Sequence, residues 1–207
     1  MTQLIKNVLC FGDSNTWGLN CETGKRFDEH TRWTSLLNQQ LGSEYKVIEA
    51  GQPNRTLVKK PPFSGALNGI SYLKPYLEQH VVSTIVIALG TNDLKKRFDL
   101  SPVKIASGLA SLITSIKHFY ADAELPNIVL FGPLFISPQP PLRDIYLNCE
   151  DKLAPLSICF KHVANEHTLR YVDLSPLTTL LAIDGIHLSS QGHKRLSEIV
   201  TDVICSL

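Results

Sequence analysis

Four short segments of this 207-residue sequence hold residue types that together could transfer an acyl group. Each follows a β-rich apolar run, and in chain order they supply a serine, a glycine, an asparagine and an aspartate–histidine pair: Ser14, Gly51, Asn92, Asp184 and His187. A serine hydroxyl is a weak nucleophile until a base lies within hydrogen-bond reach. A neutral histidine suits that role near physiological pH. The set therefore indicates acyl transfer by an activated serine.

The order and spacing of these residues suggest a role for each. Asp184 precedes His187 by three positions, so one turn could bring its carboxylate to the imidazole and fix the tautomer. The tetrahedral intermediate also needs donors around its oxyanion. The backbone N–H groups of Ser14 and Gly51 and the amide of Asn92 are suitable donors. The candidate catalytic residues are thus Ser14, Asp184 and His187, and the candidate oxyanion hole is Ser14, Gly51 and Asn92.

Each segment taken alone has an ordinary structural interpretation. Gly-Asp-Ser at 12–14 is a common turn and capping sequence, and Gly-Thr-Asn-Asp at 90–93 is a plausible turn. Asp-Gly at 184–185 could be a turn before the last helix, and a single histidine is more often a polar surface residue than a base. The coincidence of all four segments at successive strand ends favours the functional interpretation.

Three neighbouring residues are candidate supports of the site: Asp13, Trp17 and Asp93. Trp17 could form a wall of the substrate pocket, or it could pack the first helix in the core. Asp93 could hold the Asn92 loop by hydrogen bonds, or it could be a solvated turn residue. The basic run at 95–97 is either a solvated face or a contact for an anionic group of the substrate. The proline-rich connection 132–143 is either a stiff pocket wall or an ordinary surface loop.

Strands and helices that alternate along the chain are expected to position these residues. Near-continuous apolar runs predict strands buried on both faces, and the helical patterns between them predict covering helices. We expect a parallel sheet with helices on both sides, and ligands in such sheets bind at the carboxyl ends of the strands. The expected strands are 5–10, 45–48, 84–89, 127–131 and 170–174, and the expected helices are 31–41, 69–79, 101–120, 145–167 (broken or kinked at Pro155) and 190–207.

Composition narrows the class of protein further. Hydrophobic residues make up 43% of the chain, and the net charge of +1 gives no electrostatic footprint for nucleic acid or an anionic membrane. The five cysteines are scattered, so we expect free thiols in a reducing compartment. The start of the sequence lacks the pattern of a secretory signal, and no stretch has the length of a membrane span. We expect a cytoplasmic protein that binds neither nucleic acid nor membrane and has no metal site, since His162–His167 lacks zinc-ligand spacing.

These residues resemble the SGNH hydrolases, also called GDSL-type esterases. Gly12-Asp13-Ser14, Gly51, Gly90-Thr91-Asn92-Asp93 and Asp184-Gly185-Ile186-His187 match the family's blocks in order, across nearly the whole chain. The resemblance implies a three-layer α/β/α flavodoxin-like fold with a mostly parallel five-stranded sheet, formed by residues 1–207 as one domain. It also implies no cofactor, a small-molecule ester substrate, and often a homo-oligomer. By the same resemblance, Ser14 is the nucleophile, His187 the base and Asp184 its orienter.

Further segments resemble the arylesterase and acyltransferase branch, whose members act on short acyl esters. These are Thr16-Trp17-Gly18, Arg55-Thr56, Leu67-Asn68-Gly69 and Tyr72-Leu73, although Asn54 and Leu57 depart from the residues usual around the Arg-Thr pair. We therefore expect a serine esterase that hydrolyses or transfers short acyl groups through an acyl-enzyme on Ser14. A carbohydrate O-deacetylase or an acyl thioesterase with the same triad is the alternative, and a catalytically inactive binding protein of the same fold is the alternative outside enzymes.

Overall fold

Five strands form the central sheet, in the spatial order β2-β1-β3-β4-β5, and every neighbouring pair is parallel. This order is that of flavodoxin-like folds. The computed structural model describes residues 5–58 and 69–207, so the sequence features at 59–63 and 67–68 lie outside the described residues. The strands are β1 (Lys6–Gly12), β2 (Tyr45–Gly51), β3 (Val82–Ala88), β4 (Asn127–Phe131) and β5 (Arg170–Val172).

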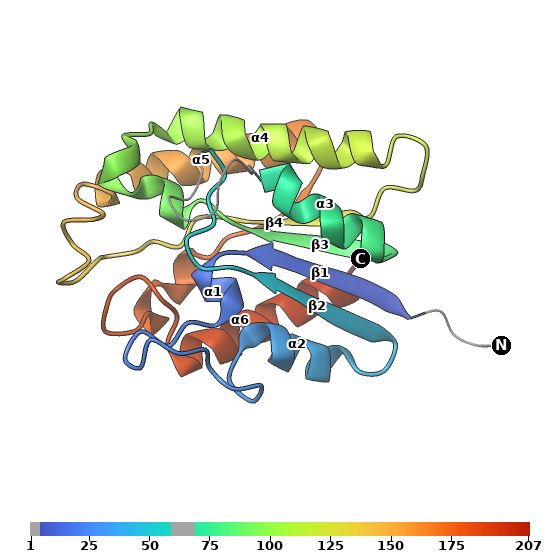
Figure 1. The fold of residues 1–207 in the computed structure, drawn as a ribbon, viewed down its shortest axis with the longest axis horizontal. Coiled ribbons are helices and arrows are strands. Elements are labelled where there is room, and N and C mark those ends of the chain that lie inside the picture. Colours follow the sequence, from blue (N-terminus) through green and yellow to red (C-terminus); the bar gives the residue numbers. More distant parts are fainter. Residues whose placement is uncertain (1–4, 59–68) are drawn as a thin grey trace.

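Helices cover both faces of the sheet, which confirms the three-layer α/β/α fold. In Figure 1, α3, α4 and α5 lie above the sheet, and α1, α2 and α6 lie below it. The strands are buried on both faces, as their continuous apolar composition predicts, with Val8, Leu9, Val86 and Val129 fully inaccessible. The helices are α1 (Ser14–Trp17), α2 (Trp33–Leu41), α3 (Gly69–Gln79), α4 (Pro102–Phe119), α5 (Glu150–His167) and α6 (Ser190–Cys205).

The local signals placed most helix ends within two residues. Ser101 caps α4 through a hydrogen bond from the Lys104 N–H, with Pro102 in the first position, as expected. The helix expected from 145 begins instead at Glu150, because residues before it form a series of hydrogen-bonded turns. Pro155 lies inside α5, and the helix continues through it, so the helix expected to be broken or kinked there is not broken. Pro155 is the sixth residue of α5, so the helix lacks the one hydrogen bond that an N–H at 155 would donate to the carbonyl of Asp151.

The carboxyl ends of all five strands point to one side of the molecule. The connections that follow them gather there, on the left of Figure 1, and include the short 3₁₀ helices η1 (Thr91–Leu94), η2 (Lys96–Phe98) and η3 (Ser175–Leu180). No helix in the described ranges is long and apolar enough to cross a membrane. All five cysteines are free thiols.

Candidate active site

Ser14 lies at the first turn after the central strand β1. Asp13 caps the one-turn helix α1, because its carboxylate accepts the backbone N–H of Asn15 at 3.0 Å. Only 8% of Ser14 is exposed, and Asp13 beneath it is buried. Burial raises the pKa of Asp13, although its hydrogen bond from Asn15 and the nearby charges of His187, Lys95 and Arg55 oppose that rise. The cap therefore holds Ser14 at the carboxyl edge of the sheet.

The turn between η3 and α6 brings the predicted base and its carboxylate to Ser14. His187 Nε2 lies 3.0 Å from Ser14 Oγ, and His187 Nδ1 lies 2.5 Å from Asp184 Oδ2. The other carboxylate oxygen, Oδ1, accepts the backbone N–H groups of Ile186 and His187, each at 3.0 Å. The structure thus places the three predicted catalytic residues in one chain of hydrogen bonds.

The electrostatics of this turn favour an ionised Asp184. Burial alone would raise its pKa, but hydrogen bonds from the His187 ring and from the two backbone N–H groups outweigh that effect and lower the pKa to about 2. An ionised carboxylate next to Nδ1 fixes the proton of a neutral imidazole on that nitrogen. The Nε2 lone pair is then free to accept the hydroxyl proton of Ser14.

Asn15 is a site residue that the sequence analysis missed. Its Nδ2 donates to the Ile186 carbonyl at 3.3 Å, and its Oδ1 accepts the Leu188 N–H at 2.8 Å. Both bonds clamp the backbone on either side of His187, more than 170 positions away in sequence. An asparagine beside a serine carries no local signal for such a role, so only the three-dimensional structure shows it.

Asn92 lies in η1, directly after β3, with its side chain held at both ends. Its Nδ2 donates to the Arg55 carbonyl at 3.1 Å, and its Oδ1 accepts the hydroxyl of Tyr146 at 3.2 Å. A primary amide has two N–H donors, so one remains for a ligand. Asn92 is 4% exposed. The geometry leaves it able to act as an oxyanion donor.

Gly51 has a different position from the one expected of an oxyanion donor. It pairs with Gly12 at the end of the edge strand β2, and the N–H of the next residue, Gln52, donates to the Gly12 carbonyl at 3.1 Å. In a parallel ladder this pattern turns the N–H of Gly51 away from β1 and toward the open edge. The expected role of Gly51 in the oxyanion hole therefore finds no support in this geometry.

What requires a glycine at position 51 is packing against α1. A Cβ there would overlap the backbone nitrogen of Trp17 and the carbonyl carbon of Thr16. The close approach places the turn after β2 beside the first turn after β1. Gly51 thus positions the site through its lack of a side chain.

The turn at 52–55 lies next to Asn92. Arg55 N–H donates to the Gln52 carbonyl at 3.2 Å, and Pro53 has no N–H. Within the described part of the chain, the N–H of Asn54 has no acceptor, and this residue has a left-handed φ of 66°. Asn54 N–H is therefore a free donor in the turn that contacts Asn92.

Two charged residues after Asn92 are buried and bonded. Asp93 accepts the backbone N–H groups of Leu57 and Val58, each at 2.9 Å, and so holds the segment after β2. Burial raises the pKa of Asp93 to about 7. Lys95 is 8% exposed, and its ammonium donates to Asn54 Oδ1 at 2.7 Å. Of the run at 95–97, Lys95 thus departs from the solvated interpretation.

Trp17 is the last residue of α1 and is half-buried. The guanidinium carbon of Arg26 lies 5.8 Å from its ring centroid, and Arg26 Nε donates to the Trp17 carbonyl at 2.6 Å. The large core tryptophan is Trp33, which is 1% exposed. A role for Trp17 as a substrate wall stays a prediction.

Comparison with known proteins yields one family and several similar structures. The model of the GDSL-like lipase/acylhydrolase family matches residues 10–195. Est24, a carbohydrate acetylesterase from Sinorhizobium meliloti, is 30% identical with a TM-score of 0.90, covering 97% of this chain and 99% of that one. The inhibitor-bound aryl esterase of M. smegmatis is 31% identical with a TM-score of 0.90, covering 98% and 99%. A putative arylesterase from Agrobacterium tumefaciens is 26% identical with a TM-score of 0.85, covering 98% and 99%. Comparison with the curated proteins gave no match.

Proposed function

Because the chain belongs to the GDSL-like lipase/acylhydrolase family and is a carboxylic ester hydrolase, we propose that it cleaves esters of short acyl groups through an acyl-enzyme on Ser14. The observation that carries the proposal is the continuous chain of hydrogen bonds from Ser14 Oγ through the His187 ring to the Asp184 carboxylate. An activated serine of this kind splits ester cleavage into acylation and deacylation.

The geometry accounts for both half-reactions. Ser14 Oγ attacks the ester carbonyl while His187 Nε2 takes its proton, and Asp184 stabilises the imidazolium. Collapse of the tetrahedral intermediate breaks the bond to the alcohol oxygen, which leaves with the proton from Nε2. Water, or a second alcohol, then attacks the acyl carbonyl by the same route and returns the hydroxyl of Ser14.

The developing oxyanion needs donors on the side opposite the base. We assign this role to the backbone N–H of Ser14, the Nδ2 of Asn92 and the N–H of Asn54, in place of the expected N–H of Gly51. The support is that the Arg55 carbonyl, next to Asn54, accepts from Asn92, whereas Gly51 N–H points to the sheet edge. Lys95 bonds the Asn54 side chain and would hold this turn in place.

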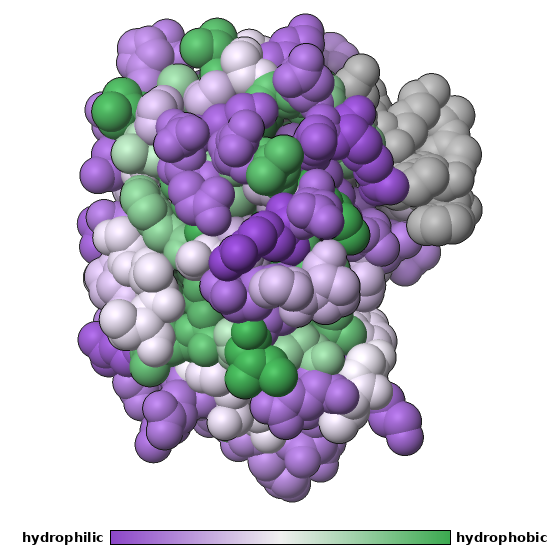
Figure 2. All heavy atoms as spheres, turned by 90° about the vertical axis from the view of Figure 1, so that its left-hand side faces the viewer, coloured by the Kyte–Doolittle hydropathy of each residue, from purple (hydrophilic) through white to green (hydrophobic). Residues whose placement is uncertain are grey.

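The preference for short acyl groups draws on the comparisons. One similar structure is a carbohydrate acetylesterase and another an aryl esterase, each aligned over nearly the whole chain. The loops beside the site also expose apolar side chains: Ile183 (74% exposed), Ile145 and Leu147. Figure 2, which views the carboxyl ends of the strands, shows hydrophobic residues in the middle of this face between hydrophilic ones. An ester of a small acid with an apolar or aryl alcohol fits that surface.

Removal of an acetyl group from a carbohydrate is a second candidate function, favoured by Est24 and by another carbohydrate acetylesterase of Sinorhizobium meliloti, which is 25% identical with a TM-score of 0.88. The chemistry at Ser14 would be the same, and only the alcohol would differ. Rates on aryl acetates, acetylated sugars and acetyl thioesters separate these substrates. A profile from acetate to laurate esters tests the acyl length, and faster turnover of laurate would contradict the short-acyl proposal.

Labelling with a fluorophosphonate, followed by peptide mass spectrometry, tests the nucleophile. We expect an adduct on Ser14, and Ser14→Ala should lose both the adduct and about 10⁴-fold or more in kcat. Ser111→Ala, an exposed serine on α4, is the matched control and should keep both. An adduct elsewhere, or a near-normal rate for Ser14→Ala, would overturn the assignment, and no adduct at all would favour an inactive binding protein.

Two further expectations from the sequence stay predictions. A single cooperative unfolding transition is expected if residues 1–207 form one domain. A homo-oligomer is expected from the family resemblance, and light scattering at micromolar concentration measures it directly. A monomer peak would contradict the second expectation.

A further inference from the structure

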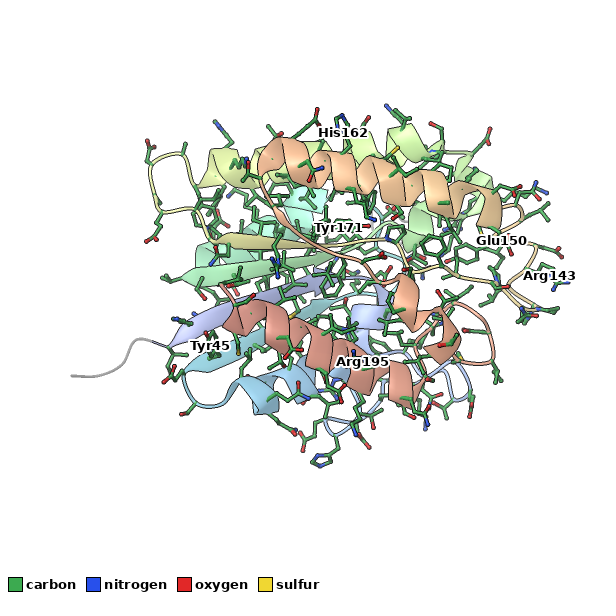
Figure 3. All side chains as sticks on the ribbon, turned by 180° about the vertical axis from the view of Figure 1, so that it is seen from behind. Tyr45, Arg143, Glu150, His162, Tyr171 and Arg195 are labelled. Atoms are coloured by element: carbon green, nitrogen blue, oxygen red, sulfur yellow. The ribbon has the colours of Figure 1, made fainter. Side chains whose placement is uncertain are left out.

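The connection from β4 to α5, residues 132–149, contacts both halves of the site. It leaves the sheet after Phe131 and enters α5 at Glu150. Figure 3 shows Arg143 at the outer tip of this connection and Glu150 at the start of the helix, both at the carboxyl edge of the sheet. Hydrogen bonds within it, such as Leu142 N–H to the Gln139 carbonyl at 2.8 Å and Cys149 N–H to the Tyr146 carbonyl at 3.0 Å, give it a fixed shape.

One end of this connection is bonded to the turn that holds the base. Ser137 N–H donates to the Gly185 carbonyl at 2.8 Å, and Gln139 N–H donates to the Asp184 carbonyl at 2.9 Å. Gly185 has a φ of 70°, and a Cβ on it would overlap the Ser137 carbonyl. The backbone of Asp184 and Gly185 is therefore seated directly against the connection.

The other end is bonded to the segment of Asn92. Lys96 N–H donates to the Ile145 carbonyl at 2.8 Å, and the Tyr146 hydroxyl donates to Asn92 Oδ1 at 3.2 Å. Tyr146 is 5% exposed, and the Lys95 ammonium lies 5.7 Å from its ring centroid. The hydroxyl is thus a buried donor to Asn92 Oδ1.

We propose that Tyr146 is a positioning residue for catalysis, which fixes the Asn92 amide with its second N–H available to the oxyanion. This inference rests on the proposed role of Asn92 in the oxyanion hole. The Arg55 carbonyl can only accept, so it selects the amide orientation in which Nδ2 faces it; the Tyr146 hydroxyl then donates to Oδ1 and holds the amide in that orientation.

The loss of the hydroxyl has two physical consequences. Asn92 Oδ1 becomes a buried acceptor without a donor, so the amide gains freedom to rotate away from its catalytic orientation. The amide also loses a bond that polarises its N–H groups, because hydrogen bonds in a chain strengthen one another. Both effects act on the transition state, where the oxyanion is present, more than on the bound ester.

The test compares Tyr146→Phe with Tyr171→Phe on p-nitrophenyl acetate, with active sites titrated by a phosphonate. Tyr171 is the matched control because its hydroxyl bonds Ser157 at 3.2 Å, between the sheet and α5 in Figure 3. We expect Tyr146→Phe to lower kcat about 3- to 10-fold, with KM changed less than 2-fold, and to slow phosphonylation of Ser14 similarly. Tyr171→Phe should keep kcat.

The same two substitutions, made in an Asn92→Ala background, distinguish failure of the positioning role of Tyr146 from failure of the oxyanion role of Asn92. Asn92→Ala should itself lower kcat about 100-fold or more, and Tyr146→Phe should add nothing to it. If Asn92→Ala loses activity while Tyr146→Phe keeps it, or if the Tyr146 effect persists unchanged without the amide, the positioning role is overturned and the proposed function stands. If Asn92→Ala keeps its rate, the oxyanion role of Asn92 and this inference both fail.

Discussion

Replacement of Asp184 by asparagine should place the wrong tautomer of His187 against Ser14. In the parent, Oδ1 accepts two backbone N–H groups, and Oδ2 faces Nδ1 of the ring. The backbone donors fix the orientation of an asparagine, because its single oxygen must take the Oδ1 position to accept them. The amide NH₂ then points at Nδ1, which must accept, and the ring proton moves to Nε2. The hydroxyl of Ser14 would have no base.

The size of the loss follows from what a reversal of the amide would cost. Turning the oxygen back to Nδ1 would leave the N–H groups of Ile186 and His187 facing another donor, at about 1–3 kcal/mol for each unsatisfied group. The variant also lacks the charge that stabilises the imidazolium, worth about 1.5–3 kcal/mol. At the lower bounds these effects amount to about 3.5 kcal/mol, or about 400-fold in kcat.

Steady-state hydrolysis of p-nitrophenyl acetate at pH 7.5 measures this loss. Asp184 is ionised there, because its hydrogen bonds outweigh burial and lower its pKa to about 2. Asp173→Asn is the matched control, since Asp173 is an exposed carboxylate that also accepts a backbone N–H, from Ser175 at 3.0 Å. The control should keep its rate. An Asp184→Asn variant with more than a tenth of parental kcat would refute the tautomer argument.

Two further changes test the packing and the titration around the site. Gly51→Ala should cost about 3 kcal/mol of unfolding free energy, because the new methyl group meets the Trp17 backbone, and an unchanged urea midpoint would contradict that contact. Burial, with the nearby charges of His187 and Arg32, lowers the pKa of His193 to about 4, so the unfolded chain binds this proton first as pH falls from 6.5. Protonation of the unfolded chain at His193 should therefore lower the free energy of unfolding of the parent by about 3 kcal/mol between pH 6.5 and 4, and His193→Phe should lack this contribution. Urea melts at several pH values measure it, and the same change in unfolding free energy with pH in both proteins would refute the argument.

The sequence was sufficient for the architecture because the signals for strands and helices are local. Continuous apolar runs marked all five strands, and Ser101 with Pro102 marked the start of α4. Since parallel strands end at one edge, the residues after them had to converge. Ser14, Asp184 and His187 follow from that rule and from the chemistry of their side chains.

The residues that sequence reasoning missed act through bonds between distant loops. Asn15 bonds the backbone beside His187, and Tyr146 bonds Asn92, yet neither side chain has a type or spacing that predicts its distant partner. Gly51 shows the opposite limit. The sequence singled out Gly51 as an oxyanion donor, but what requires a glycine there is contact with α1, which the pairing of β1 and β2 determines.

Buried polar side chains hold the loops of the site together, in addition to the backbone hydrogen bonds between them. Asp93 accepts the backbone after β2, Asn15 clamps the backbone around His187, and Arg55 donates to the Gly12 carbonyl at 2.8 Å at the end of β1. Each bond joins a loop after one strand to a loop or strand end elsewhere on the same edge. The sheet therefore sets where the loops begin, and buried polar contacts between them set the ångström-scale geometry on which catalysis depends. It follows that conservative changes at these contacts should lower kcat with little change in the melting temperature. Changes in the strand cores should lower the melting temperature with little change in the kcat of the folded enzyme.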